Sequence, residues 1–503
     1  MTKSAIRSLL RFLTNPSSVL WLCIAVTVYT TIMPLYRATM FLEIKYNEGW
    51  NAYNAAILAH HGFIYPVRYG WIMANYPVLS FFTIAQLGRF THDYLYTGRF
   101  LSWLGLILSC IFVGIIVDHL TRSRRSGVLA GLICLALFCT CDHYNVGMNE
   151  PQLIAQAFFM AGLLLYVLYR DRPWTLAAIA LLFVVGGNFK HNLIDFPMFL
   201  CIELLIVSRR RLAFFILMIA AFEVPAYYLN VHIGGPFFLD QLLVPRRYLW
   251  DKPLWVSFDY YIVLLIPVVA ALYTLARSFR IPERRVIAIF FVVSFALDTY
   301  FSGGEGVSVN AFFSNTLALA IVLGLFLHDF GVPHPRLPGT SAQWNAAATL
   351  ILFYWMLIPL ACNDAFFPIE NWNDLHAQQQ RFTDQVKFMR AHPGPAICES
   401  ILVCYYSDKP YIVDPFNSAS LIHAGKLDEN VLVGAIHAHQ FAVLQFNKPP
   451  LANGLPDAPI ERYTPAVLQA VRDNYTPAFR RSDSTIYIPA SSVPSQPANP
   501  APR

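Results

Sequence analysis

A short stretch near the N-terminus, YNEGWNAYNAA at 46–56, places one carboxylate among aromatic and amide side chains. It directly follows an apolar run that is long enough to cross a membrane. Glu48 is the acid of this stretch, and Glu43 lies at the end of the apolar run. A positioned carboxylate can remove the proton from an attacking hydroxyl group. An acid in the first turn of a helix is also favoured by the helix dipole without any catalytic role, so the stretch alone leaves both interpretations open.

Ionisable residues recur in other loops that the topology derived below assigns to the same side of the membrane. Glu150 begins one apolar segment, Lys190 precedes another, and Arg246 and Arg247 lie in a long loop. Ionisable groups at membrane depth cost free energy, so several at one boundary indicate a site for a polar group at the lipid surface. A phosphate-linked lipid is such a group. Breaking its bond to a sugar requires a cation or metal for the released phosphate and a base for the attacking hydroxyl.

The composition is that of a polytopic membrane protein with some soluble mass. The 503 residues are 56% hydrophobic and only 13% charged, and the mean hydropathy is +0.47. Soluble domains carry about 25% charged residues. The net charge of +6 does not indicate a nucleic-acid partner, because the basic residues fall in short loops between apolar runs.

Eleven apolar segments are candidate membrane spans, and they define a transmembrane module over 1–362. With the N-terminus in the cytoplasm, every cytoplasmic loop carries arginine, as the positive-inside rule requires. The loop 37–96 and the C-terminal segment then lie on the outer side. Three candidates are short and would need tilt or neighbours at the boundary. The segments are 17–36, 97–118, 126–141, 151–169, 174–187, 193–208, 212–229, 257–276, 286–301, 310–328 and 344–362.

Two short helices are predicted in the first outer loop. Asn47 can cap the first and Gly62 can end it, and apolar side chains at helical spacing predict that it lies in the membrane interface. The segment 75–90 predicts a second helix with Pro77 in its first turn.

The segment 363–490 predicts a small α/β domain. Helices are expected at 374–392 and 428–439, and strands in ILVCYY, PYIVD and FAVLQF. Cys398 and Cys404 lie in this segment and would pair if it faces an oxidising compartment, which the sequence leaves open. The tail at 491–503 is rich in Pro, Ser and Ala and is predicted to be disordered.

Several segments, in their order along the chain, resemble the C-type glycosyltransferase (GT-C) superfamily. Its members include protein O-mannosyltransferases and lipid A aminoarabinose transferases, and the resemblance covers most of the chain. The similar segments are NEGWNAYNAAILAHHGFIYP (47–66), NYPVLSFFTIAQLGR…GRFLS (75–102), GMNEPQLIAQAFFMAGLLLY (147–166), NFKHNLIDFP (188–197), GEGVSVNAFFSNTLALAI (304–321) and CESILVCYYSDKPYIVDPF (398–416).

The resemblance implies a hexosyl or pentosyl transferase that takes a sugar from a polyprenyl phosphate. The acceptor would be an envelope lipid, glycan or protein at the outer face of a bacterial inner membrane, with a periplasmic C-terminal domain. Glu48 takes the place of the base and Glu150 that of the second acid, while Lys190, Arg246 and Arg247 would neutralise the donor phosphate. The residues assigned to acceptor or sugar binding are Glu43, Tyr53, Tyr76, His143, Glu305 and Asn310.

No metal ligand is assigned. Asn47 stands where many relatives have Asp, which argues against a two-carboxylate metal site, and His60, His61, His143 and His191 follow no recognised motif. A divalent cation, Mg²⁺ or Mn²⁺, is left open as a cofactor.

Two other functions remain open on the sequence. Glu203 and Glu223 lie within predicted spans, and such acids keep a lipid or solute transporter or flippase in consideration. An oligosaccharide ligase with a lipid-diphosphate donor is the other alternative, although it would favour more cations than a lysine and an arginine pair.

Overall fold

The computed structural model of the protein describes residues 15–142, 145–244, 246–330, 341–358, 360, 368–447 and 462–490. The chain forms two compact units. Unit 1 comprises Met1–Thr39, Tyr76–Ile233 and Tyr248–Asp374, and unit 2 comprises Met40–Asn75, Gly234–Arg247 and Leu375–Arg503. The first outer loop therefore contributes a segment to the same unit as the C-terminal segment.

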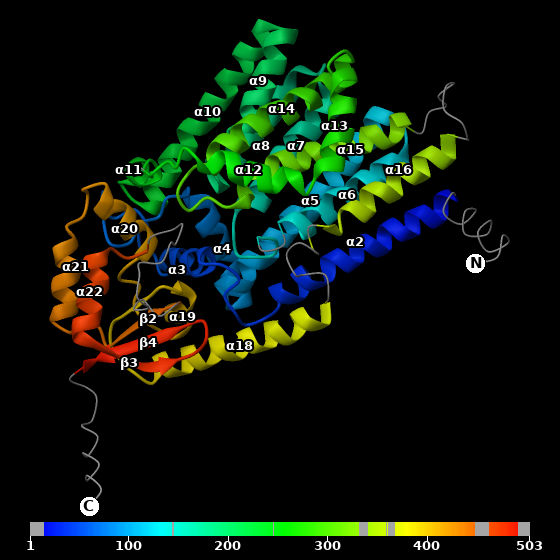
Figure 1. Ribbon diagram of the computed structural model, residues 1–503. Coiled ribbons are helices and arrows are strands. Elements are labelled where there is room, and N and C mark those ends of the chain that lie inside the picture. Colours follow the sequence, from blue (N-terminus) through cyan, green and yellow to red (C-terminus); the bar gives the residue numbers. More distant parts are fainter. Residues whose placement is uncertain are drawn as a thin grey trace, which may run out of the picture. The chain divides into compact units, whose positions relative to one another are not determined.

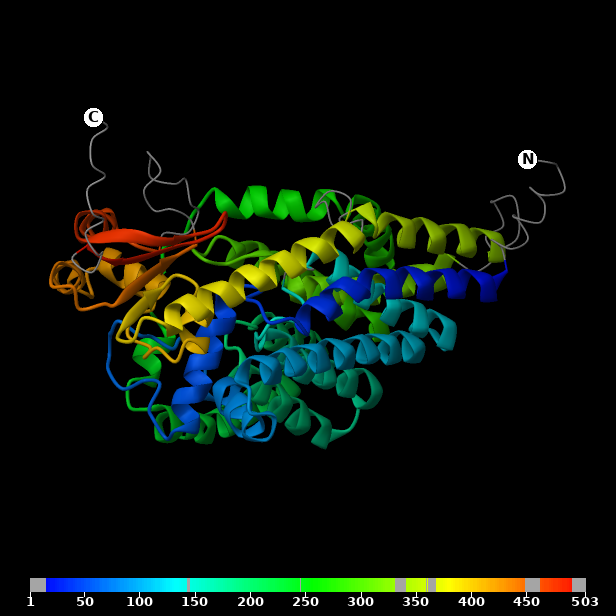
Figure 2. The ribbon, with the colours of Figure 1, turned by 90° about the horizontal axis from the view of Figure 1, so that it is seen from below.

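Unit 1 is a bundle of helices (Figure 1). In it, α5 packs against both α6 and α7, and α2 runs beside α6 and α16 (Figure 2). The helices of this unit are α2 (Pro16–Ala38), α4 (Val78–Thr91), α5 (Tyr94–Thr121), α6 (Arg124–Cys141), α7 (Gln152–Tyr169), α8 (Pro173–Phe189), α9 (Asp195–Val207), α10 (Arg209–Gly234), α12 (Lys252–Ile262), α13 (Leu265–Ser278), α14 (Pro282–Ser302), the 3₁₀ helix η1 (Val309–Phe312), α15 (Phe313–Phe330) and α16 (Ser341–Trp355).

Seven helices in the described part of the chain are long and apolar enough to cross a membrane: α2, α5, α6, α7, α10, α14 and η1 joined to α15. The predicted span 257–276 is not one straight helix, because α12 and α13 meet at a bend of 93°. Pro267 lies in the first turn of α13, where its missing N–H leaves no donor for the carbonyl four residues earlier. The expected eleven spans are therefore not confirmed as a count.

Glycines allow the spanning helices of unit 1 to approach closely. A Cβ added to Gly105 of α5 would lie 2.5 Å from the Cα of Ile154 on α7. Gly127 of α6 faces Gly114 of α5, and a Cβ there would lie 2.6 Å from the Gly114 carbonyl oxygen. Lipid supplies no hydrophobic driving force for helix association, so the close van der Waals packing that small residues allow stabilises such crossings.

Unit 2 contains a four-stranded sheet in the order β1-β2-β4-β3. Strands β1 and β2 are parallel, and the other two pairs are antiparallel. Its elements are α3 (Asn47–Ala59), α11 (Phe238–Leu242), most of α18 (Pro368–Arg390), β1 (Ala396–Cys398), α19 (Ile401–Tyr406), α20 (Pro415–His423), α21 (Glu429–His437), β2 (Val443–Phe446), α22 (Pro465–Asn474), β3 (Tyr475–Arg480) and β4 (Thr485–Pro489).

The C-terminal helices were predicted better than the strands. Both expected helices form, as α18 and α21, and FAVLQF contains β2. ILVCYY is instead helix α19, and PYIVD is not a strand, because Asp414 caps α20 with Pro415 as its first residue. The tail predicted to be disordered lies outside the described residues.

Helix α3 differs from the expected interfacial helix. It begins at Asn47, so Tyr46 is its N-cap and Asn47 is not. Most of its residues are buried, including the polar Glu48, Asn51 and Asn54, so it has no water-facing polar side. Helix α4 begins at Val78, directly after Pro77, close to the prediction.

The crossing of α3 and α19 in unit 2 depends on Gly49. A Cβ at this position would lie 2.2 Å from the Leu402 backbone nitrogen and 2.7 Å from the Ile401 carbonyl carbon. Gly49→Ala is therefore expected to lower the free energy of unfolding by at least about 2 kcal/mol, since backbone atoms must separate. Denaturation in mild detergent measures this.

Gly434→Ala in α21 is the matched control. Nothing lies within 4 Å of the added Cβ, so alanine should stabilise the helix by about 0.5–1 kcal/mol. Equal effects at the two positions would contradict the close crossing.

Candidate functional site

Glu48 and Glu43 form the acidic part of the candidate site in unit 2. Glu48 lies in the first turn of α3 and is fully buried, and its Oε2 accepts a hydrogen bond of 2.7 Å from the Ile44 N–H. Glu43 accepts one bond of 2.5 Å from the Ser400 hydroxyl and a longer one of 3.4 Å from the Leu402 N–H. The carboxylates of the two residues interact electrostatically. The first outer loop thus brings both of its predicted acids together.

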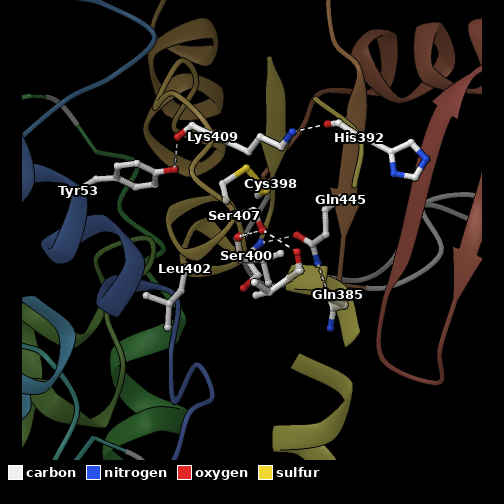
Figure 3. The surroundings of a disulfide bond; sticks show 12 residues. Tyr53, Gln385, His392, Cys398, Ser400, Leu402, Ser407, Lys409 and Gln445 are labelled. Carbon is white, nitrogen blue, oxygen red and sulfur yellow. Dashed lines mark hydrogen bonds between the residues drawn. A yellow bond between two sulfur atoms is a disulfide. The ribbon is translucent and has the colours of Figure 1, made fainter. Parts of the chain in front are cut away.

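The partner of Glu43 is a loop closed by a disulfide between Cys398 and Cys404 (Figure 3). Ser400 within this loop donates its N–H to the Gln445 side chain of β2 at 2.8 Å. The amide of Gln445 in turn donates to Gln385 of α18. The loop is therefore fixed at both ends and through its centre, which holds the Ser400 hydroxyl in place for Glu43.

Aromatic side chains surround a second carboxylate of unit 2, Asp414. Tyr46 and Tyr411 donate their hydroxyls to its two oxygens at 2.5 and 3.2 Å. The Arg462 guanidinium lies 3.9 Å from the centroid of the Tyr46 ring. Tyr53 stacks on Tyr411 with centroids 4.6 Å apart and donates to the Lys409 carbonyl oxygen at 2.7 Å, as Figure 3 shows for the hydrogen bond. These contacts account for the burial of Tyr53 without a sugar ligand, so its assignment to sugar binding stays a prediction.

Glu43 is expected to make stability depend on pH. Burial raises the pKa of its carboxyl from 4.5 to about 7, against the Ser400 hydrogen bond and with the help of the Glu48 charge. The folded state keeps the Glu43 proton to higher pH than the unfolded chain does, so the free energy of unfolding should fall as pH rises from 4.5 to about 7. The fall should not exceed about 3 kcal/mol, the equivalent of the pKa shift.

Denaturation of the wild type and of Glu43→Gln between pH 4 and pH 8 measures this contribution. Glutamine keeps the shape of the protonated acid, so the variant should lack the decline that the wild type shows. Parallel pH profiles of the two proteins would show that Glu43 does not titrate in this way.

Lys190 and Glu150 form a buried ion pair in unit 1. Glu150 precedes α7, Lys190 follows α8, and Lys190 Nζ lies 2.5 Å from Glu150 Oε1, with side-chain exposures of only 4% and 6%. The other Glu150 oxygen accepts the Gln152 N–H at 2.7 Å. The ammonium of Lys190 also lies 3.7 Å from the centroid of the Tyr76 ring. Three residues predicted from the sequence thus form one cluster. The Glu150 carboxylate and the face of the Tyr76 ring both contact the Lys190 ammonium.

The same cluster continues to Asn310 through Gln152. The two side chains exchange hydrogen bonds, from Asn310 Nδ2 to Gln152 Oε1 at 2.9 Å and from Gln152 Nε2 to the Asn310 carbonyl oxygen at 2.7 Å. Glu305 is buried nearby in the chain and interacts electrostatically with Lys252. Lys252 Nζ donates to the carbonyl oxygens of Gly304 and Val307, both at 2.8 Å, and so fixes the loop before η1.

The remaining predicted site residues are less closely involved. Arg246 and Arg247 are exposed in unit 2, and the Arg246 guanidinium lies 5.5 Å from the Phe416 ring centroid. His143 lies outside the described residues. Glu203 receives two hydrogen bonds from Arg285 at 2.8 and 2.9 Å, and Glu223 accepts one from Asn188 at 3.4 Å. The two acids that favoured a transporter therefore have polar partners within unit 1.

Sequence reasoning missed Ser400, Asp414, Arg462 and Gln152. A disulfide assumed between Cys398 and Cys404 would have placed Ser400 in a tight loop. The order Asp-Pro at 414–415 is a helix-start signal that would have excluded a strand there. Nothing in the sequence signals Arg462 or Gln152, whose partners are distant along the chain.

The described residues contain no group of three or more His, Cys, Asp or Glu side chains placed to hold a metal ion. A divalent cation as cofactor stays a prediction.

Comparisons with known proteins identify the fold. Neither protein-family models nor the sequences of curated proteins match this chain. The crystal structure of ArnT from Cupriavidus metallidurans bound to undecaprenyl phosphate matches with a TM-score of 0.62 and 12% identity, over 94% of this chain and 98% of that chain. The Archaeoglobus fulgidus oligosaccharyltransferase in the apo form matches with a TM-score of 0.53 and 10% identity, over 86% of this chain and 69% of that chain. The chain has the GT-C fold.

The apo form of the Cupriavidus ArnT gives a similar result, with a TM-score of 0.60 and 11% identity over 93% of this chain and 97% of that chain. The match therefore extends over nearly the whole of a chain of similar length, its C-terminal part included. Together with the seven apolar helices, it supports a multi-pass membrane protein. The fold expected from the resemblance is confirmed.

Proposed function

We propose that this GT-C protein transfers a sugar from a polyprenyl phosphate to an acceptor hydroxyl, with inversion at the anomeric carbon. The observation that carries the proposal is the buried Lys190 ammonium, held by Glu150 and the Tyr76 ring in a chain of this fold. A desolvated cation of this kind suits a leaving phosphate, because electrostatic stabilisation is strongest where water is excluded. The structures that match include ArnT with bound undecaprenyl phosphate, which supports a lipid-phosphate donor.

The proposed reaction is a single displacement. The acceptor oxygen forms a bond to the anomeric carbon of the sugar, and the bond from that carbon to the phosphate oxygen breaks. The electron pair leaves with the polyprenyl phosphate, whose charge Lys190 stabilises. The acceptor proton passes to Glu48, which acts as the general base. Glu150 positions Lys190, and Arg246 and Arg247 are proposed as further phosphate contacts.

The proposed location is a bacterial inner membrane with the C-terminal segment in the periplasm. The positive-inside distribution supports this orientation. The disulfide of unit 2 is consistent with it, since such bonds persist in oxidising compartments. The identity of the sugar and whether the acceptor is a lipid, glycan or protein are left to the assay.

Purified protein incubated with radiolabelled polyprenyl-phosphate sugars and extracted envelope acceptors tests the proposal. The expected result is transfer of label to an acceptor together with release of polyprenyl phosphate. Uptake of labelled lipid or solute into vesicles without a new covalent product would contradict the proposal and favour a transporter. Activity only with lipid-diphosphate oligosaccharides would favour the ligase.

A further inference from the structure

A polar cavity of about 440 Å³ lies at the end of the unit 1 bundle that the positive-inside distribution assigns to the cytoplasm. Three elements form it: the end of α5, the end of α7 with the turn that follows, and the start of α14. Its volume is within the range of small-molecule sites. The residues that line it are His119, Leu120, Arg122, Tyr166, Val167, Leu168, Tyr169, Arg170, Asp171, Arg172, Glu283 and Val286.

The charges around this cavity leave an excess of positive charge. Arg170 is occupied, because it lies 3.1 Å from the Glu283 carboxylate and donates to the Pro282 carbonyl oxygen. Arg122 and Arg172 are exposed, and the guanidinium of neither makes a hydrogen bond or ion pair with a residue in the described part of the chain. With Asp171 the only other acid in the lining, two free guanidinium groups face one carboxylate, which leaves a net charge of +1.

Aromatic residues place this end of the bundle at the depth of lipid head groups. Tyr169 lines the cavity, and Trp174 packs against it with ring centroids 6.0 Å apart. Both are exposed, at 46% and 57%. Exposed Trp and Tyr at the ends of spanning helices are typical of the membrane interface. A ligand of the cavity would therefore meet lipid as well as water.

We propose that this cavity binds the phosphate of an anionic glycerophospholipid from the inner leaflet. A phosphate diester carries one negative charge, which matches the excess of the lining, and guanidinium groups bind phosphate oxygens in pairs. The apolar Leu120, Val167 and Val286 in the same lining suit the glycerol and the first acyl carbons. Basic pockets between helices on the cytoplasmic side are a known form of lipid site in membrane proteins. The site is separate from the sugar-transfer residues and does not depend on the proposed function.

Thermal unfolding of the full chain in mild detergent, titrated with phosphatidylglycerol, tests this proposal. The wild type should be stabilised, because a ligand that binds only the folded state raises the melting temperature. Phosphatidylcholine, whose head group has no net charge, should stabilise it much less. Arg122→Gln/Arg172→Gln should need at least about tenfold more phosphatidylglycerol for the same shift, as expected for two lost charge-assisted contacts.

Arg124→Gln is the matched control, because Arg124 is exposed in the same turn as Arg122 and does not line the cavity. It should respond to phosphatidylglycerol as the wild type does. An equal response of the double variant and Arg124→Gln would overturn the proposal. Glycerol 3-phosphate is the water-soluble arm, and stabilisation by it as strong as that by the lipid would show a free-phosphate site instead.

Discussion

Glu48→Gln is expected to lower the rate of sugar transfer at least about 100-fold while the protein stays folded. Glutamine has the size of glutamate, and its side-chain oxygen can still accept the Ile44 N–H that Glu48 accepts at 2.7 Å. It cannot take the acceptor proton. Turnover of a labelled polyprenyl-phosphate sugar measures the loss, and thermal unfolding establishes that the variant is folded.

The burial of Glu48 determines how an acceptor hydroxyl would reach its carboxylate. Its carboxylate is inaccessible in the structure, so an acceptor hydroxyl must displace one of its present partners before the proton moves. Hydrogen bonds at catalytic groups commonly reach their working geometry only with substrate bound. Glu48→Gln should therefore lower the turnover rate much more than it lowers the affinity for the donor.

Glu429→Gln separates this role from a structural one. Glu429 also lies in the first turn of a helix of unit 2, α21, and accepts a hydrogen bond from Thr464. If Glu48 served only the helix dipole, the two variants would lose similar small amounts of stability and both would remain active. Full activity of Glu48→Gln would remove the proposed base.

The spanning helices could be predicted from the sequence because their signal is local. The segment predicted at 97–118 is α5 at Tyr94–Thr121, and the one at 286–301 is α14 at Pro282–Ser302. Apolar length alone determines such helices, since a spanning segment must satisfy its backbone hydrogen bonds internally. The bend between α12 and α13 shows the limit of this signal, because hydropathy averages across the break and does not register the proline after it.

The strands of unit 2 could not be predicted in the same way. ILVCYY has the β-branched and aromatic residues of a strand, yet it forms α19 between a disulfide and the close approach of Gly49. Tertiary constraints of this kind override local propensity. Strand β3 carries Pro477 and Arg480, and the pairing of β3 with β4 and of β4 with β2 depends on register, which no local pattern encodes.

The sequence could predict on which side of the membrane the residues of the candidate site lie. It placed Glu150, Lys190 and Tyr76 on one face, although they are distant along the chain, and the structure brings these three into contact. It could not supply Ser400 as the partner of Glu43, because that contact requires the first outer loop to fold with the C-terminal segment. Topology thus predicts which residues share a boundary but not which of them meet.

Lys190→Met is expected to abolish sugar transfer and to destabilise the protein by about 3–5 kcal/mol, because it leaves Glu150 buried without a counter-charge. Methionine fits the same space and can pack on the Tyr76 ring. Glu150→Gln/Lys190→Met should regain most of the stability, since neither buried charge remains, yet it should stay inactive because the leaving phosphate still lacks a cation. Denaturation in mild detergent and the labelled-sugar assay measure the two effects separately.

The Arg285–Glu203 pair provides the matched comparison for the Lys190 and Glu150 variants. It is also an ion pair of unit 1, and its Glu203 side chain is 2% exposed, but it lies at the predicted cytoplasmic end. Arg285→Met should destabilise the protein, and Glu203→Gln/Arg285→Met should regain most of the stability, as for the Lys190 variants. Both Arg285 variants should still transfer sugar. If Glu150→Gln/Lys190→Met regained activity along with stability, Lys190 would be a structural partner of Glu150 only. The cation for the phosphate would then have to come from Arg246, Arg247 or another residue, because the reaction releases a charge that something must stabilise.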